Sequence, residues 1–351
     1  MLFKKFCRQP NILVVTLSIS LFLLTLSVTL ADISTLHLDG DAPIGVTANH
    51  GHKAGDVMFS YRGTVIGWQA LQSGTDTLET ADVLKDYMLA PKYMITSTQM
   101  YSAIYVPHDH ITLMAIMNYR EHIMQMEGSY QQEGGHQKQS VGIYNLDSEG
   151  FGDIKFDAQV SLLKKGHLTL IGNIGVSLPS GSIAKTGDDG RMLPYPMQLG
   201  SGSYEACPGI TLFGTKEDWS YGSQLLSSLP LHQNARKYRH GNTFTVTAWS
   251  TQRVNNWFQF GGRLLFSHKA TFSSDPELNQ NRSPIHQIDS QGNTQLDIAI
   301  STDFMIPTLT RGPLQRNRLA FELQIPVYQN LTGIQLMNRL QFTAGCQFVF
   351  R

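Results

Sequence analysis

Hydrophobic and polar residues alternate with a period of two along many segments of this chain. In residues 56–66 the odd positions are mostly apolar (Val57, Phe59, Tyr61 and Val65), whereas most even positions are polar. The same alternation recurs in residues 152–162, 294–306 and 317–327. Because successive side chains of a strand point to opposite sides, this pattern predicts β-strands with one apolar and one polar face.

The length of these segments indicates where the two faces lie. Many alternating segments run over 11 to 14 residues, whereas a strand of a soluble protein usually has about 5 or 6. A strand tilted across a bilayer needs roughly 9 to 11 residues. A soluble sheet can also turn a polar face to water, but strands of this length favour a membrane barrel with a polar lumen and an apolar face towards lipid.

The pattern predicts twelve strands with alternating long and short connections. The expected strands are residues 55–66, 93–106, 110–124, 151–163, 167–178, 206–214, 218–228, 242–254, 256–270, 294–306, 317–328 and 339–350. The long connections are residues 67–92, 125–150, 179–205, 229–241 and 271–293. A short helix is expected in the first of them, from Thr80 to Leu89. Long loops at one end and short turns at the other predict an all-β fold, a transmembrane antiparallel up-and-down β-barrel.

The N-terminus has the order of a secretory signal. Basic residues within the first eight positions precede an uncharged apolar run, Ile12 to Leu30, which ends before the small residue Ala31. An uncleaved membrane anchor is the alternative, because the run is nearly long enough to span a bilayer. The domains expected are a signal peptide over residues 1–31, a periplasmic segment over 32–54 and the outer-membrane barrel over 55–351.

Composition agrees with an exported barrel. Hydrophobic residues make up 41% of the chain and charged residues only 15%, which is low for a soluble protein. Cleavage after Ala31 leaves 24 basic and 27 acidic side chains, a balance that does not favour nucleic acid as a partner. Cys207 and Cys346 are too few for a disulfide framework in an exported chain of this length.

Most motifs of enzyme chemistry are missing. The chain contains neither Gly-x-Ser-x-Gly nor His-Glu-x-x-His, so we expect no enzymatic activity, although a Ser–His pair that meets across strands has no sequence signature. Charged residues at polar positions of the strands are expected to line a substrate path, because unpaired charge in lipid costs several kcal/mol. These residues are Arg62, Asp297, Asp303, Arg318, Glu322 and Arg339.

Methionine and histidine gather in the first third of the chain, many of them at polar positions of three neighbouring strands. Thioether and imidazole groups suit copper or another soft metal, so we consider a metal site, with methionine as adaptable apolar filler as the alternative. No other cofactor is expected. The candidate ligands are His50, His52, Met58, Met94, Met100, His110, Met114 and His122.

The final strand carries a terminal pattern typical of exported barrels. Thr343, Gly345, Phe348 and Phe350 match the polar-x-Gly-x-x-aromatic-x-aromatic arrangement of a barrel-assembly signal, although Arg351 follows the last aromatic residue. An ordinary apolar last strand is the alternative. The pattern predicts the outer membrane of a Gram-negative bacterium as the location, with membrane lipid and the barrel-assembly machinery as partners.

Three blocks of sequence resemble a known family. They are residues 42–46 (APIGV) with 49–55 (NHGHKAG) and 58–62 (MFSYR), residues 193–204 (LPYPMQLGSGSY), and residues 326–336 (PVYQNLTGIQL). Together they resemble a family of outer-membrane transporters labelled for the MetA-pathway of phenol degradation. The family usually has an Asp and a Met near the histidines, whereas Asn49 and Gly51 stand here.

These observations favour a channel or transporter through which small, hydrophobic or aromatic molecules pass without catalysis. A barrel that handles a soft metal through its Met- and His-lined lumen is a second hypothesis. A structural or adhesive barrel, whose loops bind a partner, is a third.

Overall fold

The structure, a computed structural model, describes residues 42–46, 54–131, 139–274, 282–306 and 314–350. The predicted signal peptide over residues 1–31 lies outside the described residues, as do His50 and His52.

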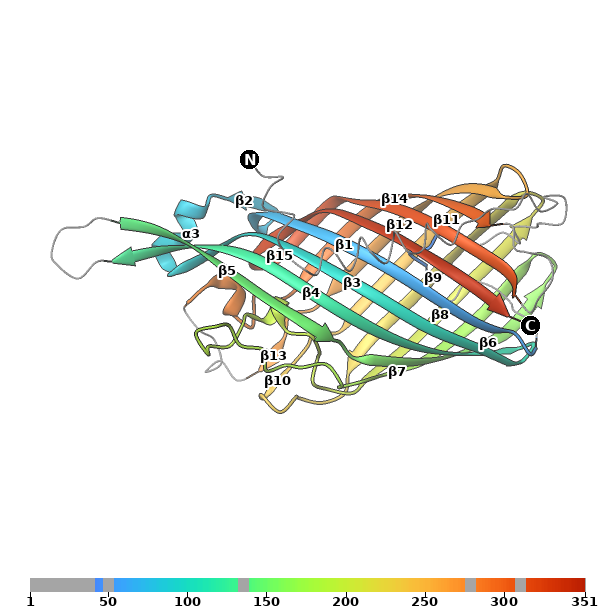
Figure 1. The fold of residues 1–351 in the computed structure, drawn as a ribbon, viewed down its shortest axis with the longest axis horizontal. Helices are drawn as coiled ribbons and strands as arrows, with labels where there is room; N and C mark the ends of the chain where they lie inside the picture. The colour runs from blue at the N-terminus through green and yellow to red at the C-terminus, as the bar shows by residue number, and fades with distance from the viewer. Residues whose placement is uncertain (1–41, 47–53, 132–138, 275–281, 307–313, 351) are drawn as a thin grey trace.

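Eleven strands form the wall, and each pairs antiparallel with its neighbours (Figure 1). They are β1 (Val57–Gly74), β3 (Leu89–His108), β4 (Ile111–Gln131), β6 (Ile154–Lys165), β7 (Leu168–Leu178), β8 (Glu205–Lys216), β9 (Trp219–Pro230), β11 (Thr243–Arg253), β12 (Phe258–Lys269), β14 (Asn293–Ile306) and β15 (Leu314–Phe350). Because β15 also pairs with β1, the sheet closes on itself. A closed barrel leaves no open edge in its wall, which is the condition for strands to cross a bilayer.

The longest strand, β15, runs along the height of the barrel wall twice. Its residues 317–331 pair with β14 and its residues 331–350 pair with β1. Gly333, between the two halves, has a φ of +69°, a conformation that glycine adopts without steric cost. Beside this turn the Gln329 side chain accepts from the Asn338 backbone N–H and donates to the Asn338 carbonyl. The chain therefore makes twelve antiparallel passes in the wall, which is the number of strands that the sequence predicts.

The two faces of the wall differ in polarity. Apolar side chains cover the outside, and Ile174 and Ile300 are 70% and 65% exposed. Polar residues that alternate with them point into the barrel, where Asp297 and Glu322 are only 1% and 2% exposed. This division confirms the predicted membrane barrel, because lipid solvates the apolar face and the lumen takes the polar face. None of the helices in the described part of the chain is long and apolar enough to cross a membrane.

Two expected loops are in large part regular. Residues 67–92 continue β1 to Gly74 and then form β2 (Asp76–Leu78) and the helix α3 (Thr80–Asp86), which begins at the predicted residue but ends before Leu89. Residues 125–150 extend β4 and form β5 (Gln139–Phe151), and this hairpin projects beyond the barrel (Figure 1). Such extensions have no lipid face, so no regular alternation marks them in the sequence.

Other connections at the same end fold over the opening of the barrel. They contain the 3-10 turns η2 (Tyr195–Met197) and η4 (Pro284–His286) and the short pair β10 (Tyr238–Arg239) and β13 (Ser273–Ser274). We call residues 179–204, 231–242, 270–274 and 282–292 the cap. Within it Tyr195, Tyr238, Phe272 and Ile288 form a small apolar core, which holds three separate connections together.

Candidate functional site

A short N-terminal segment, Ala42–Val46, lies inside the barrel. Ala42 and Val46 are buried against Phe213 of β8 and Trp249 of β11. On the other side, the Arg318 guanidinium donates a hydrogen bond to the Ala42 carbonyl. The segment Ala42–Val46 therefore lies in the lumen. The prediction that residues 32–54 form a periplasmic segment before the barrel stays a prediction for the rest of that range.

Two glycines allow the N-terminal segment to lie this close to the barrel wall. A side chain on Gly45 would overlap both the Arg263 guanidinium and the Glu322 carboxylate. A side chain on Gly345 of β15 would meet Ile44, with its Cβ 2.6 Å from the Ile44 Cδ1. The segment thus fits because two glycines leave space at its closest contacts with the wall. This fit depends on residues about 300 positions apart and has no periodic signal in the sequence.

Beside the segment, a buried network joins β12, β14 and β15. The Arg263 Nη2 donates to Glu322 Oε1 at 2.6 Å and to Gln324 Oε1 at 2.9 Å. The Gln324 amide donates to Asp297 Oδ2 at 2.6 Å, and Gln295 donates to Asp297 Oδ1 at 2.7 Å. All five side chains are less than 7% exposed. A buried charge is tolerated when it is paired and hydrogen-bonded, and this network meets that condition.

A second network lies next to it on the same strands. The Arg318 Nε donates to Asp303 Oδ1 at 3.0 Å, and the Gln259 amide donates to Asp303 Oδ2 at 2.7 Å. Asp303 is fully buried and Arg318 is 8% exposed. Because Arg318 also holds the Ala42 carbonyl, this ion pair fastens the N-terminal segment to the wall.

The structure brings together four of the six residues predicted to line a substrate path. Asp297, Asp303, Arg318 and Glu322 lie within the two networks. Arg263 was not among the residues predicted from the sequence, although it occupies an inward position of β12 between Gly262 and Leu264. Gln259, Arg263 and Ser267 alternate with outward apolar residues, and this pattern could have identified Arg263 as an inward charge.

The other two predicted residues are not hydrogen-bonded members of these networks. Arg62 of β1 lies beside them, where it lines a small pocket with Arg318 and interacts electrostatically with Glu322. Arg339 is exposed, and its Nε donates to the Gln69 carbonyl at 3.2 Å. The pairing of β1 with β15 shifts between Leu340 and Asn338, so Arg339 is an extra residue at a bulge. A bulge changes the side to which a residue points, and alternation therefore did not predict the position of Arg339.

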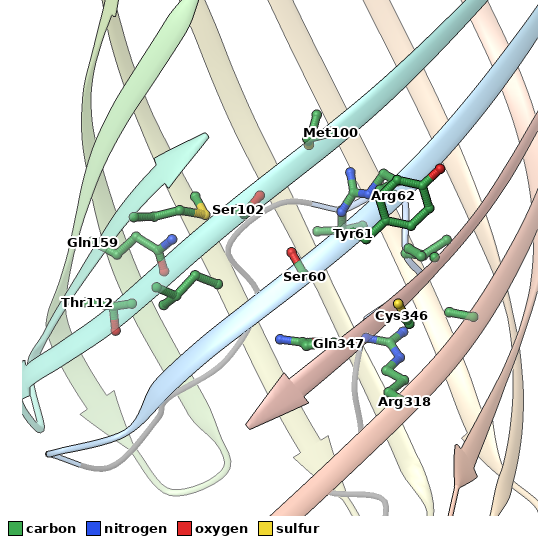
Figure 2. A pocket seen from close by; sticks show the side chains of 16 residues that line it. Ser60, Tyr61, Arg62, Met100, Ser102, Thr112, Gln159, Arg318, Cys346 and Gln347 are labelled. Carbon is green, nitrogen blue, oxygen red and sulfur yellow. The ribbon is translucent and has the colours of Figure 1, made fainter. Parts of the chain in front are cut away.

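The small pocket, which we call the inner pocket, lies near the end of the barrel with the short turns. Its volume is about 80 Å³, and Ile44 and Val46 of the N-terminal segment form part of its lining. Figure 2 shows Ser102, Thr112 and Gln159 on one side of it and Arg62, Arg318 and Gln347 on the other. The N-terminal segment and the networks thus leave little free space in this half of the lumen.

A much larger cavity, which we call the outer chamber, lies between this half and the cap. Its volume is about 620 Å³, within the usual range of roughly 300 to 1,000 Å³ for ligand sites. Apolar lining residues include Trp68, Met94, Met124, Ile285 and Leu336. Charged lining residues are Arg120, Asp153, Lys155, Glu205 and Lys269. The chamber can therefore surround a small molecule that has both an apolar and a polar part.

The candidate metal ligands fall into separate places. Met94 and Met124 are paired across β3 and β4 beside the outer chamber, where His122 Nδ1 lies 3.1 Å from Thr96 Oγ1. Met58 and Met114 both lie opposite Ile104 near the turn end. Met100 lines the inner pocket with Met114, and His110 is exposed at a turn. Among the residues described, no three His, Cys, Asp or Glu side chains are close enough to hold a metal ion.

The residues of the expected assembly signal lie on both faces of the last strand. Thr343 points inward, with its Oγ1 3.2 Å from Thr64 Oγ1, and Gly345 faces the N-terminal segment. Phe348 is paired with Phe59 of β1, and the Phe350 and Phe59 rings lie 6.0 Å apart edge-to-face. This arrangement fixes the seam between the last and first strands, and the recognition of the pattern stays a prediction.

Comparisons with known proteins bear on the fold and the family. A sequence profile described as "Putative MetA-pathway of phenol degradation" matches residues 49–308. A crystal structure of an outer membrane channel from Pseudomonas putida F1 is similar, with a TM-score of 0.57 and 10% identity over 85% of this chain and 97% of that chain. This likeness supports the barrel architecture. No curated protein sequence gives a significant match.

Two further barrels show a weaker likeness. A FadL homologue of Pseudomonas aeruginosa has a TM-score of 0.42 and 9% identity, over 84% of this chain and 90% of that chain. The toluene transporter TodX of Pseudomonas putida has a TM-score of 0.39 and 8% identity, over 90% of this chain and 99% of that chain.

Proposed function

Because this chain belongs to the family described for the MetA-pathway of phenol degradation, we propose that it is a channel of the Gram-negative outer membrane. Small, hydrophobic or aromatic molecules pass through it down their concentration gradient, without catalysis. The profile match over residues 49–308 confirms the family, and it includes residues 49–62 and 193–204 of the resembling blocks. The block at residues 326–336 lies beyond the match and stays a resemblance.

The outer chamber is the observation that carries this proposal. A barrel that served only as a structural element would gain stability from filling its lumen, since empty space in an interior costs packing energy. This lumen instead keeps a cavity of about 620 Å³ with a largely apolar side. The similar structure from Pseudomonas putida F1 is that of an outer membrane channel, which supports the same interpretation.

Passage requires a rearrangement in the turn-end half of the lumen. Ala42–Val46 and the networks around Arg263 and Arg318 occupy that half in the structure described. A solute that has entered the outer chamber therefore crosses only when the segment or its neighbours move. Such a channel would be selective and slow for ions, in contrast to an open water-filled pore.

Uptake measurements in cells test this function. A Gram-negative host that expresses the chain should accumulate labelled toluene, a neutral aromatic probe, faster than a host that expresses an unrelated barrel of similar abundance. Uptake of a labelled hydrophilic disaccharide should be the same in both hosts. Equal toluene rates in the two hosts would contradict the proposal.

We also propose that residues 343–350 direct assembly by the barrel-assembly machinery. The outward position of the Phe350 ring at the seam with β1 supports this role. Phe348→Asp and Phe350→Asp should lower the heat-modifiable, membrane-inserted fraction, whereas Gln347→Asn should not. Wild-type insertion of both aspartate variants would show that recognition lies elsewhere.

A soft-metal function and a structural or adhesive function remain alternatives that the same preparation can test. Purified protein in vesicles would have to take up copper(I) for the first. For the second, it would have to bind a partner through the cap while admitting no solute. The candidate metal ligands lie at opposite ends of the lumen, so a channel is the function that the geometry favours.

A further inference from the structure

The outer chamber contains an apolar patch beside polar and charged groups. The patch consists of Trp68, Met94, Met124 and Leu336, from β1, β3, β4 and β15, which are consecutive in the closed sheet. Other lining positions of β3 and β4 are polar, and the charged and polar residues Lys155, Glu205, Ser228 and Lys269 come from β6, β8, β9 and β12. The chamber therefore offers both an apolar and a charged surface to one molecule.

Three cationic side chains face this cavity. They are Arg120 of β4, Lys155 of β6 and Lys269 of β12. The Lys269 Nζ lies 4.8 Å from the centre of the Phe272 ring, and the His240 ring stacks on the other rings of this group at 4.2 Å from Phe272. A cation over an aromatic face is held in place by the ring quadrupole, which orients Lys269 at the boundary between the cap and the chamber.

The acidic groups that line the chamber are already engaged. Asp153 accepts hydrogen bonds from the backbone N–H groups of Gly181 and Ser201 and from the Ser201 hydroxyl, at 2.7 to 2.8 Å. Glu205 accepts from the Ser228 hydroxyl and interacts electrostatically with Arg120 and Lys269. Asp157, outside the lining, interacts in the same way with Lys155. The lining thus carries three cationic side chains and two carboxylates, Asp153 and Glu205, and Asp153 also interacts electrostatically with Arg120.

Two ring nitrogens of lining residues have no hydrogen-bond partner within the described structure. They are Nε1 of Trp68 and Nε2 of His122, both buried. An unpaired buried polar atom costs about 1 to 3 kcal/mol, and such atoms are rare in native proteins. Because both atoms belong to residues that line the cavity, a molecule bound there can supply the missing partner. The Trp68 nitrogen can only donate, so the molecule needs an acceptor.

We propose that the outer chamber binds an amphiphilic anion, namely a molecule with a compact apolar body and a single anionic head group. The apolar body packs against the patch formed by Trp68, Met94, Met124 and Leu336. The head group lies towards Lys155, Lys269 and Arg120. This inference names the ligand class of the proposed channel and rests on that function for its biological role, but the binding itself is measurable separately.

Equilibrium dialysis of the purified, detergent-solubilised barrel provides the test. The probes are benzenesulfonate and trimethylphenylammonium, which share a benzene ring and carry permanent charges of opposite sign. Wild-type protein should bind benzenesulfonate and should not measurably bind trimethylphenylammonium. In the Lys155→Gln/Lys269→Gln variant the dissociation constant for benzenesulfonate should rise at least tenfold. Lys165→Gln, on the same strand as Lys155 but exposed at the turn end, is the matched control and should bind as the wild type does.

Two results would overturn the inference. One is equal affinity of the wild type for the two probes, and the other is unchanged benzenesulfonate affinity in the double variant when the gel shift shows a folded barrel. A separate uptake assay with toluene distinguishes the proposed function. Selective binding of the anion without any solute uptake would refute the channel and leave the anion site, whereas uptake without charge preference would refute the site alone.

Discussion

The two halves of the lumen are lined by the same strands but differ in how much free space they contain. In the turn-end half, the N-terminal segment and two ion-paired networks fill the space and leave a pocket of about 80 Å³. In the loop-end half, the cap encloses about 620 Å³. In the first half Arg263 pairs with Glu322 and Arg318 pairs with Asp303, whereas several charges in the second half face the cavity. The difference indicates that the turn-end half resists passage and the loop-end half receives solute.

The comparison also shows how each half is held. Hydrogen bonds of 2.6 to 3.0 Å between side chains of β12, β14 and β15 fix the turn-end half. The cap is held by hydrogen bonds between its backbone and the side chains of Arg120 and Asp153, by bonds among its own residues, and by the aromatic group around Phe272. We therefore expect changes in the first half to affect the stability of the whole barrel, and changes in the second to affect the cap alone.

The largest expected effect comes from breaking the ion pair of the turn-end half. Arg263→Met leaves the Glu322 carboxylate buried without its guanidinium partner. Removing one member of a buried pair typically costs about 3 to 5 kcal/mol, so the variant should unfold at markedly lower urea concentration in lipid vesicles. The double variant Arg263→Met/Glu322→Leu, which buries no unpaired charge, should recover most of that loss. A single variant as stable as the wild type would contradict the proposed role of this network.

A smaller effect is expected from filling the space that admits the N-terminal segment. Gly45→Leu would place a side chain against Arg263 and Glu322, and overpacking of this kind usually costs about 1 to 3 kcal/mol. Because the segment can leave the lumen while the wall stays closed, we expect a several-fold higher ion conductance in planar bilayers. Gly67→Ala is the matched control, since its Cβ would meet no atom within 4 Å. Equal conductance of Gly45→Leu and the wild type would show that the segment does not close the lumen.

The sequence predicted the wall well because lipid and lumen impose a strict alternation. Nearly all expected strands were found, and Asp297, Asp303, Arg318 and Glu322 lie on the inward face that their parity predicts. Their part in a substrate path stays a prediction. The same rule failed for Arg339, since a single bulge in the β1–β15 pairing changes its side. Alternation is a local signal, so it cannot reveal an irregularity that depends on the partner strand.

The alternation of apolar and polar residues did not predict what fills the lumen. The position of Ala42–Val46 depends on contacts with Phe213, Trp249 and Arg318, which are distant in the chain. The outer chamber depends on how three connections pack around Phe272. The blocks that resemble the family, residues 42–46, 193–204 and 326–336, belong to the lumen segment, the cap and the β15 turn. The family resemblance thus marked segments of the lumen and the cap that hydrophobic periodicity did not identify.

In the loop-end half, the anchor of the cap can be loosened without touching the wall. Asp153→Asn replaces a carboxylate that accepts three hydrogen bonds, two of them from backbone N–H groups. Loss of such bonds costs about 1 to 3 kcal/mol, and the loss should fall on residues 179–204. Hydrogen exchange of the Gly181 and Ser201 amides should accelerate, while exchange in β12 and β14 stays unchanged. Asp188→Asn, at an exposed position of the same connection, should leave both regions as they are.

The smallest effect expected is a loosening of the cap by acid. Burial, reinforced by the nearby Arg282 charge, lowers the pKa of His286 to about 4. Burial, with Lys269 and Arg120 adding to it, lowers the pKa of His240 to about 3. The ordinary pKa of both imidazoles is about 6.5, so an opened cap takes up protons that the closed cap excludes. Closure is therefore fully favoured above about pH 6.5 and loses stability as the pH falls from there towards 4 and 3.

This acid effect separates the two halves of the lumen, because both histidines lie in the cap. Between pH 7 and pH 4.5, limited proteolysis should cleave the connections around His240 and His286 progressively faster, while the folded barrel keeps its shifted mobility on gels. In His286→Phe the increase in cleavage near residue 286 should be weaker, since an aromatic ring of similar shape remains and no proton is taken up. If His286→Phe shows the same pH dependence as the wild type at that site, protonation of this imidazole does not control the closure of the cap.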